Sequence, residues 1–341
     1  MLRAGCVTGE ETQTWQEVTL EKLFCGLDLG GTKLAGGLMR ADGELLDKEV
    51  VFDHVGKDEI AVVGRMRDVV DTLLFRQGKK VEDLEGIGVG FAGHLRFRDG
   101  VTITTSNFKG FKMKNFPLRS AIQEHFPTRV VVDNDANAQG LAEYRFGAGA
   151  GHKSMIFVTF STGIGAAIVL DGKLYRGMTG TAGEVGHMIV ESESTFVCGC
   201  GNHGCLMAHA SGLALPQVVR RKREQGVSSK LSLSEGKWER IDGKTLGEGL
   251  AVGDELSRAV VLEFADYAGI GLYNLFQIFN PDAFVLGGGL MSWGDLYVER
   301  IQRKFAELVR EMLFDPIRIV PSKLEQDAGI IGAAALLLEQ G

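Results

Sequence analysis

The sequence predicts an α/β protein built from two halves of similar organisation. A pattern of strand, glycine turn, strand, turn and strand begins at Leu23 and begins again at Met155. Long segments with apolar residues at helical spacing lie between and after these two patterns. Since strands and helices pack in layers around a shared core, and since a repeated unit indicates duplication, we expect a duplicated α/β architecture.

The first half opens on three short strands joined by tight turns. We expect strands over 23–29, 34–39 and 45–51, with turns at Gly30-Gly31-Thr32 and at Asp42-Gly43. Glycine and aspartate at such points are typical of hairpins. A helix over 58–76 and a strand over 130–132 followed by a helix over 136–146 complete this half.

The second half repeats the three strands over 155–160, 166–170 and 173–175. Its longest helix should cover 254–279, because Asn280-Pro281-Asp282 follows and proline cannot continue a helix. A strand over 283–286 then runs into Gly287-Gly288-Gly289. These elements make the second half a mixed α/β unit like the first.

Length and composition restrict the class of protein. The 341 residues suffice for two domains, and 37 Lys and Arg against 44 Asp and Glu leave a net charge of −7. This balance lacks the basic footprint of a nucleic-acid binder, and no apolar run is long enough to span a membrane. The polar start resembles no signal peptide, so we expect a cytoplasmic protein without nucleic-acid or membrane partners. The 47 glycines are the one compositional anomaly.

A polar stretch over 220–249 contains the basic run Arg220-Arg221-Lys222-Arg223. Without an accompanying DNA-binding motif, we interpret it as a solvated helix face followed by a loop.

Asp28 and the glycine turn after it suggest a phosphate site. The segment Asp28-Leu29-Gly30-Gly31-Thr32-Lys33 is not a Rossmann turn, because a second strand follows rather than a helix. Nor is there a P-loop elsewhere, since Gly243-Lys244-Thr245 has Trp238 where the first glycine belongs. A glycine hairpin can nevertheless bring backbone N–H groups close to a phosphate, and Asp28 suits Mg²⁺ through water. An ordinary hairpin turn is the alternative.

Two further glycine segments strengthen the phosphate interpretation. Thr162-Gly163-Ile164-Gly165 occupies the corresponding turn of the second half, so two glycine hairpins could hold a triphosphate from both sides. Gly287-Gly288-Gly289 directly follows a strand and could pass beneath a nucleotide base or ribose. We therefore expect a nucleotide at these turns.

A cysteine cluster predicts a structural metal site. Cys198, Cys200 and Cys205, with His187 eleven residues before the first, supply three thiolates and one imidazole. This donor set suits tetrahedral zinc, and Gly199, Gly201 and Gly204 would let the loop curve tightly. The alternatives are free cysteines, or an imidazole from His203 in the loop or His209 on a helix surface.

Six segments, in this order along the chain, resemble the motifs of the ROK family of sugar kinases, sugar-responsive repressors and unassigned reading frames, and especially its glucokinases. The six segments are Leu27-Asp28-Leu29-Gly30-Gly31-Thr32-Lys33, Asp133-Asn134-Asp135-Ala136-Asn137, Ser161-Thr162-Gly163-Ile164-Gly165, Gly183-Glu184-Val185-Gly186-His187, Cys198-Gly199-Cys200-Gly201 with Gly204-Cys205, and Val285-Leu286-Gly287-Gly288-Gly289. The resemblance extends from Phe24 to Glu339.

The resemblance implies a two-lobed, actin-like ATPase (ribonuclease H-like) fold with a cleft between the lobes. We expect an N-terminal extension over 1–23, a small lobe over 24–134 plus 325–341, and a large lobe with the zinc loop over 135–324. The implied activity is phosphorylation of a hexose, glucose above all, with ATP, Mg²⁺ and structural Zn²⁺ as cofactors. The implied partners are the sugar, ATP and further copies of the chain, as a dimer or tetramer.

The resemblance also assigns the site residues. It places the general base on Asp135, although Asp133, Asn134 or Asp135 could instead cap the helix that follows. It assigns sugar contacts to Asn107, Asn134, Asp135, Glu184 and His187. It assigns ATP binding to Asp28, Gly30, Gly31, Thr32, Lys33, Thr162, Gly163, Gly165, Gly287, Gly288 and Gly289. It assigns zinc binding to His187, Cys198, Cys200 and Cys205.

Met207 departs from the family pattern, which has a glutamate two residues after the last cysteine. We expect methionine not to accept a hydrogen bond from a sugar hydroxyl, so sugar binding should weaken about ten- to a hundredfold. Kinases of N-acetylmannosamine, N-acetylglucosamine, fructose or mannose therefore stay open, as does a sugar-binding protein without turnover. A repressor is disfavoured, because only 27 residues precede Asp28.

Overall fold

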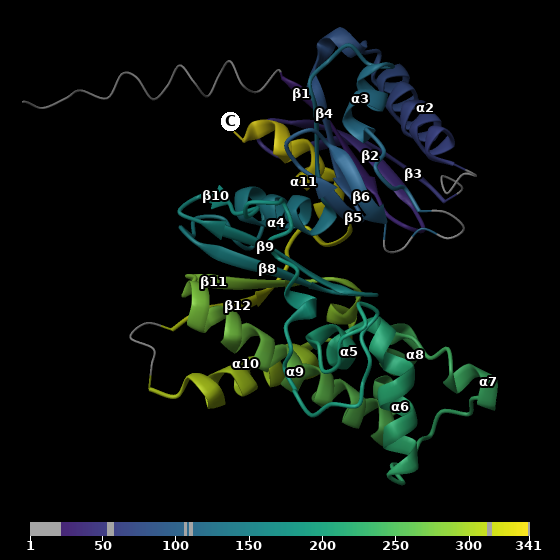
Figure 1. The fold of residues 1–341 in the computed structure, drawn as a ribbon, viewed down its shortest axis with the longest axis vertical. Coiled ribbons are helices and arrows are strands. Elements are labelled where there is room, and N and C mark those ends of the chain that lie inside the picture. Colours follow the sequence, from purple (N-terminus) through teal and green to yellow (C-terminus); the bar gives the residue numbers. More distant parts are fainter. Residues whose placement is uncertain (1–21, 53–57, 106–107, 109–111, 312–315, 340–341) are drawn as a thin grey trace, which may run out of the picture. The chain divides into compact units, whose positions relative to one another are not determined.

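The computed structural model describes residues 22–52, 58–105, 108, 112–311 and 316–339. The chain divides into two units, one of Met1–Ala138 with Gly329–Gly341 and one of Gln139–Ala328. Each unit contains a five-stranded sheet, drawn in Figure 1.

The sheet of the first unit has the order β3-β2-β1-β4-β7. Strands β1 to β3 form the predicted antiparallel meander, while β4 and β7 lie parallel to β1. Their bounds are β1 (Leu23–Leu29), β2 (Leu34–Arg40), β3 (Leu45–Val51), β4 (Leu84–Phe91) and β7 (Val130–Asn134).

Helices cover both faces of this sheet. On β2, a methyl group at Gly36 would lie 2.5 Å from Val69 of α2 (Glu59–Gln77). On β1, a methyl group at Gly26 would lie 2.0 Å from the Ile330 carbonyl oxygen of α11 (Ala328–Ala335). Gly36 is paired with Leu27, the neighbour of Gly26, and successive strand residues face opposite sides, so α2 and α11 pack on opposite faces (Figure 1). The glycines permit the close approach of α11.

A small hairpin and several short helices complete the first unit. The hairpin joins β5 (Gly93–Arg96) to β6 (Val101–Thr105). The other helices are η1 (Val81–Asp83), α3 (Leu118–Gln123) and η6 (Leu336–Leu338).

The sheet of the second unit repeats this topology. Its order is β10-β9-β8-β11-β12, again with an antiparallel meander of three strands and two strands parallel to the first. The bounds are β8 (Met155–Phe160), β9 (Ile164–Leu170), β10 (Lys173–Leu174), β11 (Ala283–Gly287) and β12 (Arg318–Pro321). The predicted duplication is therefore confirmed at the level of strand order and direction.

Two long helices form much of the core of the second unit. Helix α9 (Glu255–Phe279) begins where Asp254 accepts the Ser257 N–H, and it packs on α10 (Asp295–Val309). Phe284 of β11 and Phe305 of α10 stack edge to face within this core. The other helices of this unit are η2 (Val185–His187), α5 (Leu206–Ala210), η3 (Gly212–Ala214), α6 (Leu215–Glu224), α7 (Glu235–Trp238), α8 (Gly243–Ala251), η4 (Gly289–Trp293) and η5 (Glu325–Asp327). Helix α4 (Asp135–Phe146) begins in the first unit and continues into the second.

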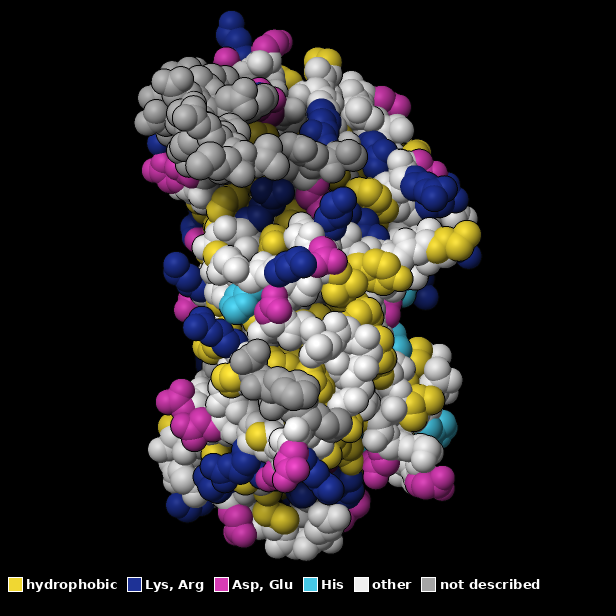
Figure 2. All heavy atoms as spheres, turned by 90° about the vertical axis from the view of Figure 1, so that its left-hand side faces the viewer, with side chains coloured by type: hydrophobic (Ala, Val, Ile, Leu, Met, Phe, Trp, Pro, Cys, Tyr) yellow, Lys and Arg dark blue, Asp and Glu magenta, His cyan; other side chains and the backbone are white. Residues whose placement is uncertain are grey.

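The basic run on α6 is mostly partnered rather than solvated. Arg221 and Lys222 both form ion pairs with Glu263 of α9, and the Arg223 guanidinium lies 4.4 Å from the Trp238 ring centroid. The expected loop after it is also partly wrong, because α7 and α8 form within 235–251. Lys and Arg side chains are interspersed with Asp and Glu on the face shown in Figure 2.

Among the described residues, every helix is too short or too polar to cross a membrane.

Candidate functional site

The first glycine turn lies between β1 and β2, as expected. The Gly30 N–H donates to the Lys33 carbonyl at 3.0 Å, which closes the turn. Asp28 precedes it at the end of β1 and is half-buried. Burial raises the pKa of the Asp28 carboxyl, and the Lys33 ammonium partly offsets this rise. The turn thus places a carboxylate beside a glycine backbone, as a phosphate and Mg²⁺ site requires.

The second glycine turn lies between β8 and β9 and is hydrogen-bonded to a neighbouring short helix, η3. The Ser161 N–H donates to the Gly163 carbonyl at 2.9 Å within the turn. The N–H groups of Gly212 and Leu213, in η3, donate to the Ser161 and Thr162 carbonyls at 2.7 and 3.1 Å. The turn is therefore fixed against η3.

A cavity of about 590 Å³ opens beside this second turn. Ser161 and Thr162 line one side, and η4 contributes Gly289 and Leu290. The start of α8 contributes Asp242, Gly243 and Lys244. A cavity of this size with few polar groups suits a small ligand such as a nucleoside.

The glycines at 287–289 have separate roles. A methyl group at Gly287 would lie 2.7 Å from the Phe157 ring, and one at Gly288 would lie 2.3 Å from the Phe160 carbonyl oxygen. Gly288 also has a φ of +92°, which favours glycine. Only Gly289 of the three lines the cavity. Close packing on β8 therefore accounts for the first two glycines.

Sequence reasoning missed the segment at the start of α8. Gly243-Lys244-Thr245 does not match a P-loop, yet Gly243 and Lys244 line the cavity. The missed signal is a helix cap: Asp242 accepts the Thr245 N–H at 2.8 Å, ahead of the buried Leu246. These bonds hold the pKa of the Asp242 carboxyl below its usual value.

The three polar residues at the junction of β7 and α4, Asp133, Asn134 and Asp135, make different hydrogen bonds. Asp133 is buried and accepts from the Asn137 side-chain amide at 3.0 Å. Asn134 accepts the N–H groups of Ala136 and Asn137 at 2.9 and 3.3 Å, and its own amide donates to the Gly93 carbonyl at 3.3 Å. Asn134 is therefore the helix cap, and its oxygen is engaged within the protein.

Asp135 is the first residue of α4 and is half-buried. Its Oδ1 accepts the N–H of Ala136 at 3.0 Å. A carboxylate at a helix N-terminus is favoured as the anion, which is the form a proton acceptor needs.

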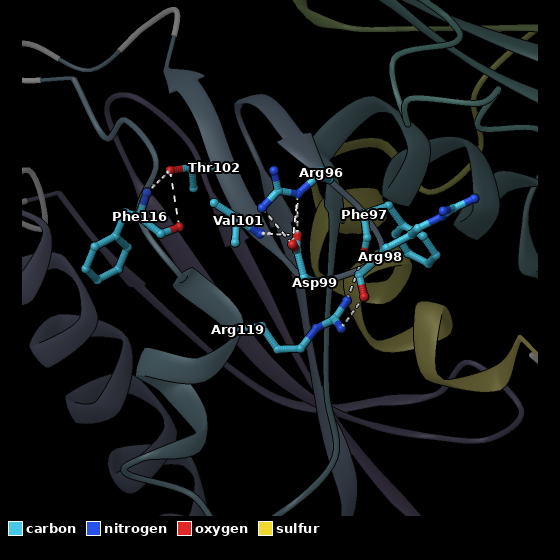
Figure 3. Close-up of polar contacts among 8 residues, drawn as sticks. All are labelled: Arg96, Phe97, Arg98, Asp99, Val101, Thr102, Phe116 and Arg119. Carbon is cyan, nitrogen blue, oxygen red and sulfur yellow. Dashed lines mark hydrogen bonds and ion pairs between the residues drawn. The ribbon is translucent and has the colours of Figure 1, made fainter.

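Asn107 lies outside the described residues, but the chain on both sides of it is anchored. Thr102 of β6 donates its N–H to the Phe116 carbonyl at 2.9 Å and accepts the Phe116 N–H on Oγ1 at 3.1 Å. Figure 3 shows this pair beside the turn of the hairpin, where Arg119 donates to the Phe97 and Arg98 carbonyls at 2.6 and 2.8 Å. The hairpin is thereby tied to α3.

The four predicted zinc ligands converge. One ligand atom from each of His187, Cys198, Cys200 and Cys205 lies within 4.8 Å of all the others. Cys198 Sγ is 3.5 Å from His187 Nδ1, and Cys200 Sγ is 3.8 Å from Cys205 Sγ. Three thiols and one imidazole in this arrangement fit a closed tetrahedral zinc site.

The pKa values of two of these thiols are shifted in opposite directions. Burial raises the pKa of the Cys205 thiol to about 12, whereas the Asn202 backbone N–H lowers that of Cys200. A buried thiol of this kind needs a cation to become a thiolate.

The glycines of the zinc loop are not equivalent. Gly204 has a φ of +68°, and a methyl group there would lie 1.9 Å from the Glu191 carbonyl oxygen. Gly201 has a φ of +91°. Gly199 has neither a positive φ nor a close neighbour, so curvature explains only two of the three.

His203 is exposed and His209 is buried, and both lie outside the cluster. The expectation that His209 lies on a helix surface is wrong. Its ring stacks on those of Tyr267 and Phe196, with centroids 4.2 and 5.2 Å away. His209 is thus part of the packing beneath the zinc loop.

Glu184 and His187 lie on one short turn against β9. A methyl group at Gly183, whose φ is +95°, would lie 2.3 Å from the Ala166 carbonyl oxygen, so the backbone approaches β9 closely. The His187 N–H donates to the Glu184 carbonyl at 3.0 Å. The Glu184 side chain makes no capping bond to this turn.

The Met207 side chain lies against the second glycine turn. Its thioether sulfur accepts the backbone N–H of Ile164 at 3.2 Å, so it serves as a hydrogen-bond acceptor toward the second glycine turn.

Comparisons with known proteins agree with the motifs. A family model described as the ROK family matches residues 24–340. A glucokinase of Halalkalibacterium halodurans is 30% identical over 94% of this chain and 96% of its own. A xylose repressor of Caldicellulosiruptor bescii is 31% identical over 92% of this chain and 77% of its own.

A solved structure is similar as well. The crystal structure of a ROK family glucokinase from Streptomyces griseus, in complex with glucose and AMPPNP, has a TM-score of 0.77 and 32% identity over 92% of this chain and 98% of its own. With the strand order of both sheets, this likeness confirms the expected actin-like α/β fold class.

Proposed function

Because the chain belongs to the ROK family, we propose that it is an ATP-dependent hexose kinase whose preferred substrate is glucose. The cavity beside the second glycine turn is the observation that carries this proposal. A phosphoryl donor needs a nucleoside pocket next to a phosphate-binding backbone, and this cavity joins Thr162 to Gly289 and the start of α8.

In this proposal the two glycine turns bind the phosphates of ATP. Asp28 would hold Mg²⁺ through water beside Gly30, Gly31, Thr32 and Lys33. The metal would neutralise charge on the phosphates, and no covalent chemistry is asked of the protein. Backbone N–H groups near glycine can approach a phosphate because no Cβ intervenes. Thr162, Gly163 and Gly165 supply the corresponding backbone in the second unit.

Asp135 would accept the proton of the sugar hydroxyl as that oxygen takes up the phosphoryl group. A half-buried carboxylate at the start of α4, where the helix dipole favours the anion, accepts the Ala136 N–H, which suits a base that mainly orients the hydroxyl. Asn134 supports this role of Asp135, because Asn134 rather than Asp135 caps α4.

Glu184, His187 and Asn107 would bind sugar hydroxyls. The pairing of Cys198 with His187 Nδ1 leaves Nε2 as the nitrogen for a sugar hydroxyl. Zinc on His187, Cys198, Cys200 and Cys205 would fix the orientation of this imidazole, and it has no part in phosphoryl transfer. We propose an assembly of two or four copies for the active protein.

A sugar-responsive regulator is the second candidate, since a xylose repressor is as similar to this chain as the glucokinases are. The two candidates differ in turnover. A regulator that only senses sugar would bind it without consuming ATP.

An ADP-release assay with a panel of sugars separates the candidates. The panel contains glucose, mannose, fructose, N-acetylglucosamine and N-acetylmannosamine, each with ATP and Mg²⁺. We expect glucose to give the highest kcat/KM, and Met207→Glu, run alongside, to lower the KM for glucose about ten- to a hundredfold. If glucose binds in calorimetry while no sugar stimulates ADP release, the kinase proposal fails.

A further inference from the structure

The Met207 thioether accepts the N–H of Ile164, in the second glycine turn, at 3.2 Å. We propose that Met207 is a positioning residue for the nucleotide: its sulfur keeps the Ile164 N–H directed into the protein and so fixes the backbone of Thr162 and Gly163. The inference rests on the proposed function, because that function assigns the nucleotide phosphates to this turn.

The Met207 side chain packs between two turns of the second unit. Sδ lies 3.2 Å from the Ile164 nitrogen. A methyl group added to Gly163 would lie 3.4 Å from Sδ, and one added to Gly186 would lie 2.7 Å from Cε. The side chain therefore packs between the nucleotide turn and the turn that carries Glu184 and His187. Since both neighbours are glycines, the thioether lies directly against their backbones.

The backbone of Met207 is itself fixed. The N–H of the preceding residue, Leu206, donates to the Met188 carbonyl at 2.8 Å. The Ser211 hydroxyl donates to the Met207 carbonyl at 2.6 Å. Cys205, one of the four proposed zinc ligands, is the residue just before α5. Met207 thus projects from a helix that is anchored at both ends.

The same short segment holds the rest of the turn. The Gly212 and Leu213 N–H groups donate to the Ser161 and Thr162 carbonyls, while Met207 accepts the Ile164 N–H. Residues 207–213, which begin two positions after Cys205, therefore bond to two carbonyls and one N–H of the turn. A displacement of the zinc loop would reach the nucleotide turn along this segment.

Removing the acceptor while keeping the volume isolates its contribution. Met207→Leu keeps a side chain of similar size but leaves the Ile164 N–H without its partner. Loss of one such hydrogen bond should weaken nucleotide binding about two- to tenfold. Met207→Gln restores an acceptor through its amide oxygen and should recover binding. Met155→Leu, a buried methionine at the far end of β8, is the control.

The test combines two readouts on the full chain. Hydrogen exchange reports the Ile164 amide, and titration calorimetry gives the Kd of Mg²⁺-AMPPNP and, separately, of glucose. We expect Met207→Leu to speed exchange at Ile164 and to raise the Kd of AMPPNP two- to tenfold, with the glucose Kd within twofold of wild type. Met207→Gln and Met155→Leu should resemble wild type in both readouts.

Other outcomes overturn the inference. Unchanged exchange and unchanged AMPPNP affinity in Met207→Leu would do so, as would a Met207→Gln variant as impaired as Met207→Leu. A loss confined to glucose binding would assign Met207 to the sugar instead. Absence of AMPPNP binding in the wild type would refute the proposed function itself, which the wild-type titration shows before any variant is made.

Discussion

Gly329 lies directly against the carboxylate of Asp28: a methyl group on its Cα would sit 2.6 Å from Oδ2. Gly329 belongs to α11, near the end of the chain, and α11 packs on β1, the strand that contains Asp28. Helix α11 and the segment that leads into the first glycine turn thus meet at one carboxylate. The position of this carboxylate depends on the absence of a side chain at residue 329.

We predict that Gly329→Ala impairs turnover by displacing Asp28. Overpacking of this kind costs about 1–3 kcal/mol of stability. The displaced carboxylate should also lower kcat, and this loss of activity should exceed what the loss of folded protein accounts for. Gly64→Ala in α2 is the matched control, since nothing lies within 4 Å of its added methyl group. ADP-release kinetics and thermal melts of both variants provide the test, and wild-type kcat in Gly329→Ala would contradict the role of Asp28.

Asp135→Asn should abolish most turnover and spare the fold. The amide oxygen can still accept the Ala136 N–H, but it cannot take a proton, so we expect kcat to fall by about two or more orders of magnitude. The Kd for glucose should change little. Asp71→Asn, on the exposed side of α2, controls for the loss of one charge. A kcat near that of wild type would remove Asp135 from the role of base.

Zinc should bind at one ion per chain, and its removal should destabilise the second unit. Elemental analysis of purified protein measures the zinc content, and thermal melts with and without a chelator measure the stability. Cys205→Ser should lose the metal, since a hydroxyl replaces a zinc thiolate. Cys25→Ala, at a buried cysteine outside the cluster, should retain it. Full zinc content in Cys205→Ser would contradict the assignment of ligands.

His209 should make stability depend on pH. Burial lowers the pKa of its imidazole, outweighing the carboxylates of Glu191 and Glu263, which raise it, while Arg221 lowers it further. The neutral ring is therefore favoured in the folded state, and the unfolded chain takes up the proton first as the pH falls below about 6.5. The free energy of unfolding should decrease from pH 6.5 downward, at up to about 1.4 kcal/mol per pH unit, and level off below the folded pKa.

Urea denaturation between pH 7.5 and pH 5 measures this slope. His209→Phe, which keeps a ring between Phe196 and Tyr267, should flatten it. The lowered pKa values of Asp242 and Asp254 act only below about 3.8, outside this window. A slope that is the same in wild type and His209→Phe would show that other groups set the pH dependence.

The sequence predicted the two strand meanders within one or two residues, because each is local and is closed by glycine or aspartate turns. It did not identify α10 or β12, since neither has a diagnostic turn or motif. The same limit applies to His209: nothing in Ala208-His209-Ala210 indicates that Phe196 and Tyr267 enclose the ring, because Tyr267 lies far along the chain.

The candidate site divides in the same way. The proposed zinc ligands are close in sequence, so their spacing alone was enough to predict that they form one cluster. The wall that α8 contributes to the cavity depends on tertiary packing of Gly243 against Leu290, and no local pattern encodes it. Similarly, the identity of the cap at α4 was ambiguous among three adjacent residues until the bonds of Asn134 resolved it.

The central claim is transfer of a phosphoryl group from ATP to a sugar hydroxyl. Mass spectrometry of glucose incubated with the protein, ATP and Mg²⁺ tests it most directly. We predict a product heavier than glucose by one phosphoryl group, formed in step with ADP and nearly absent with Asp135→Asn. Release of free phosphate without a phosphorylated sugar, or unchanged ATP beside bound glucose, would contradict the claim.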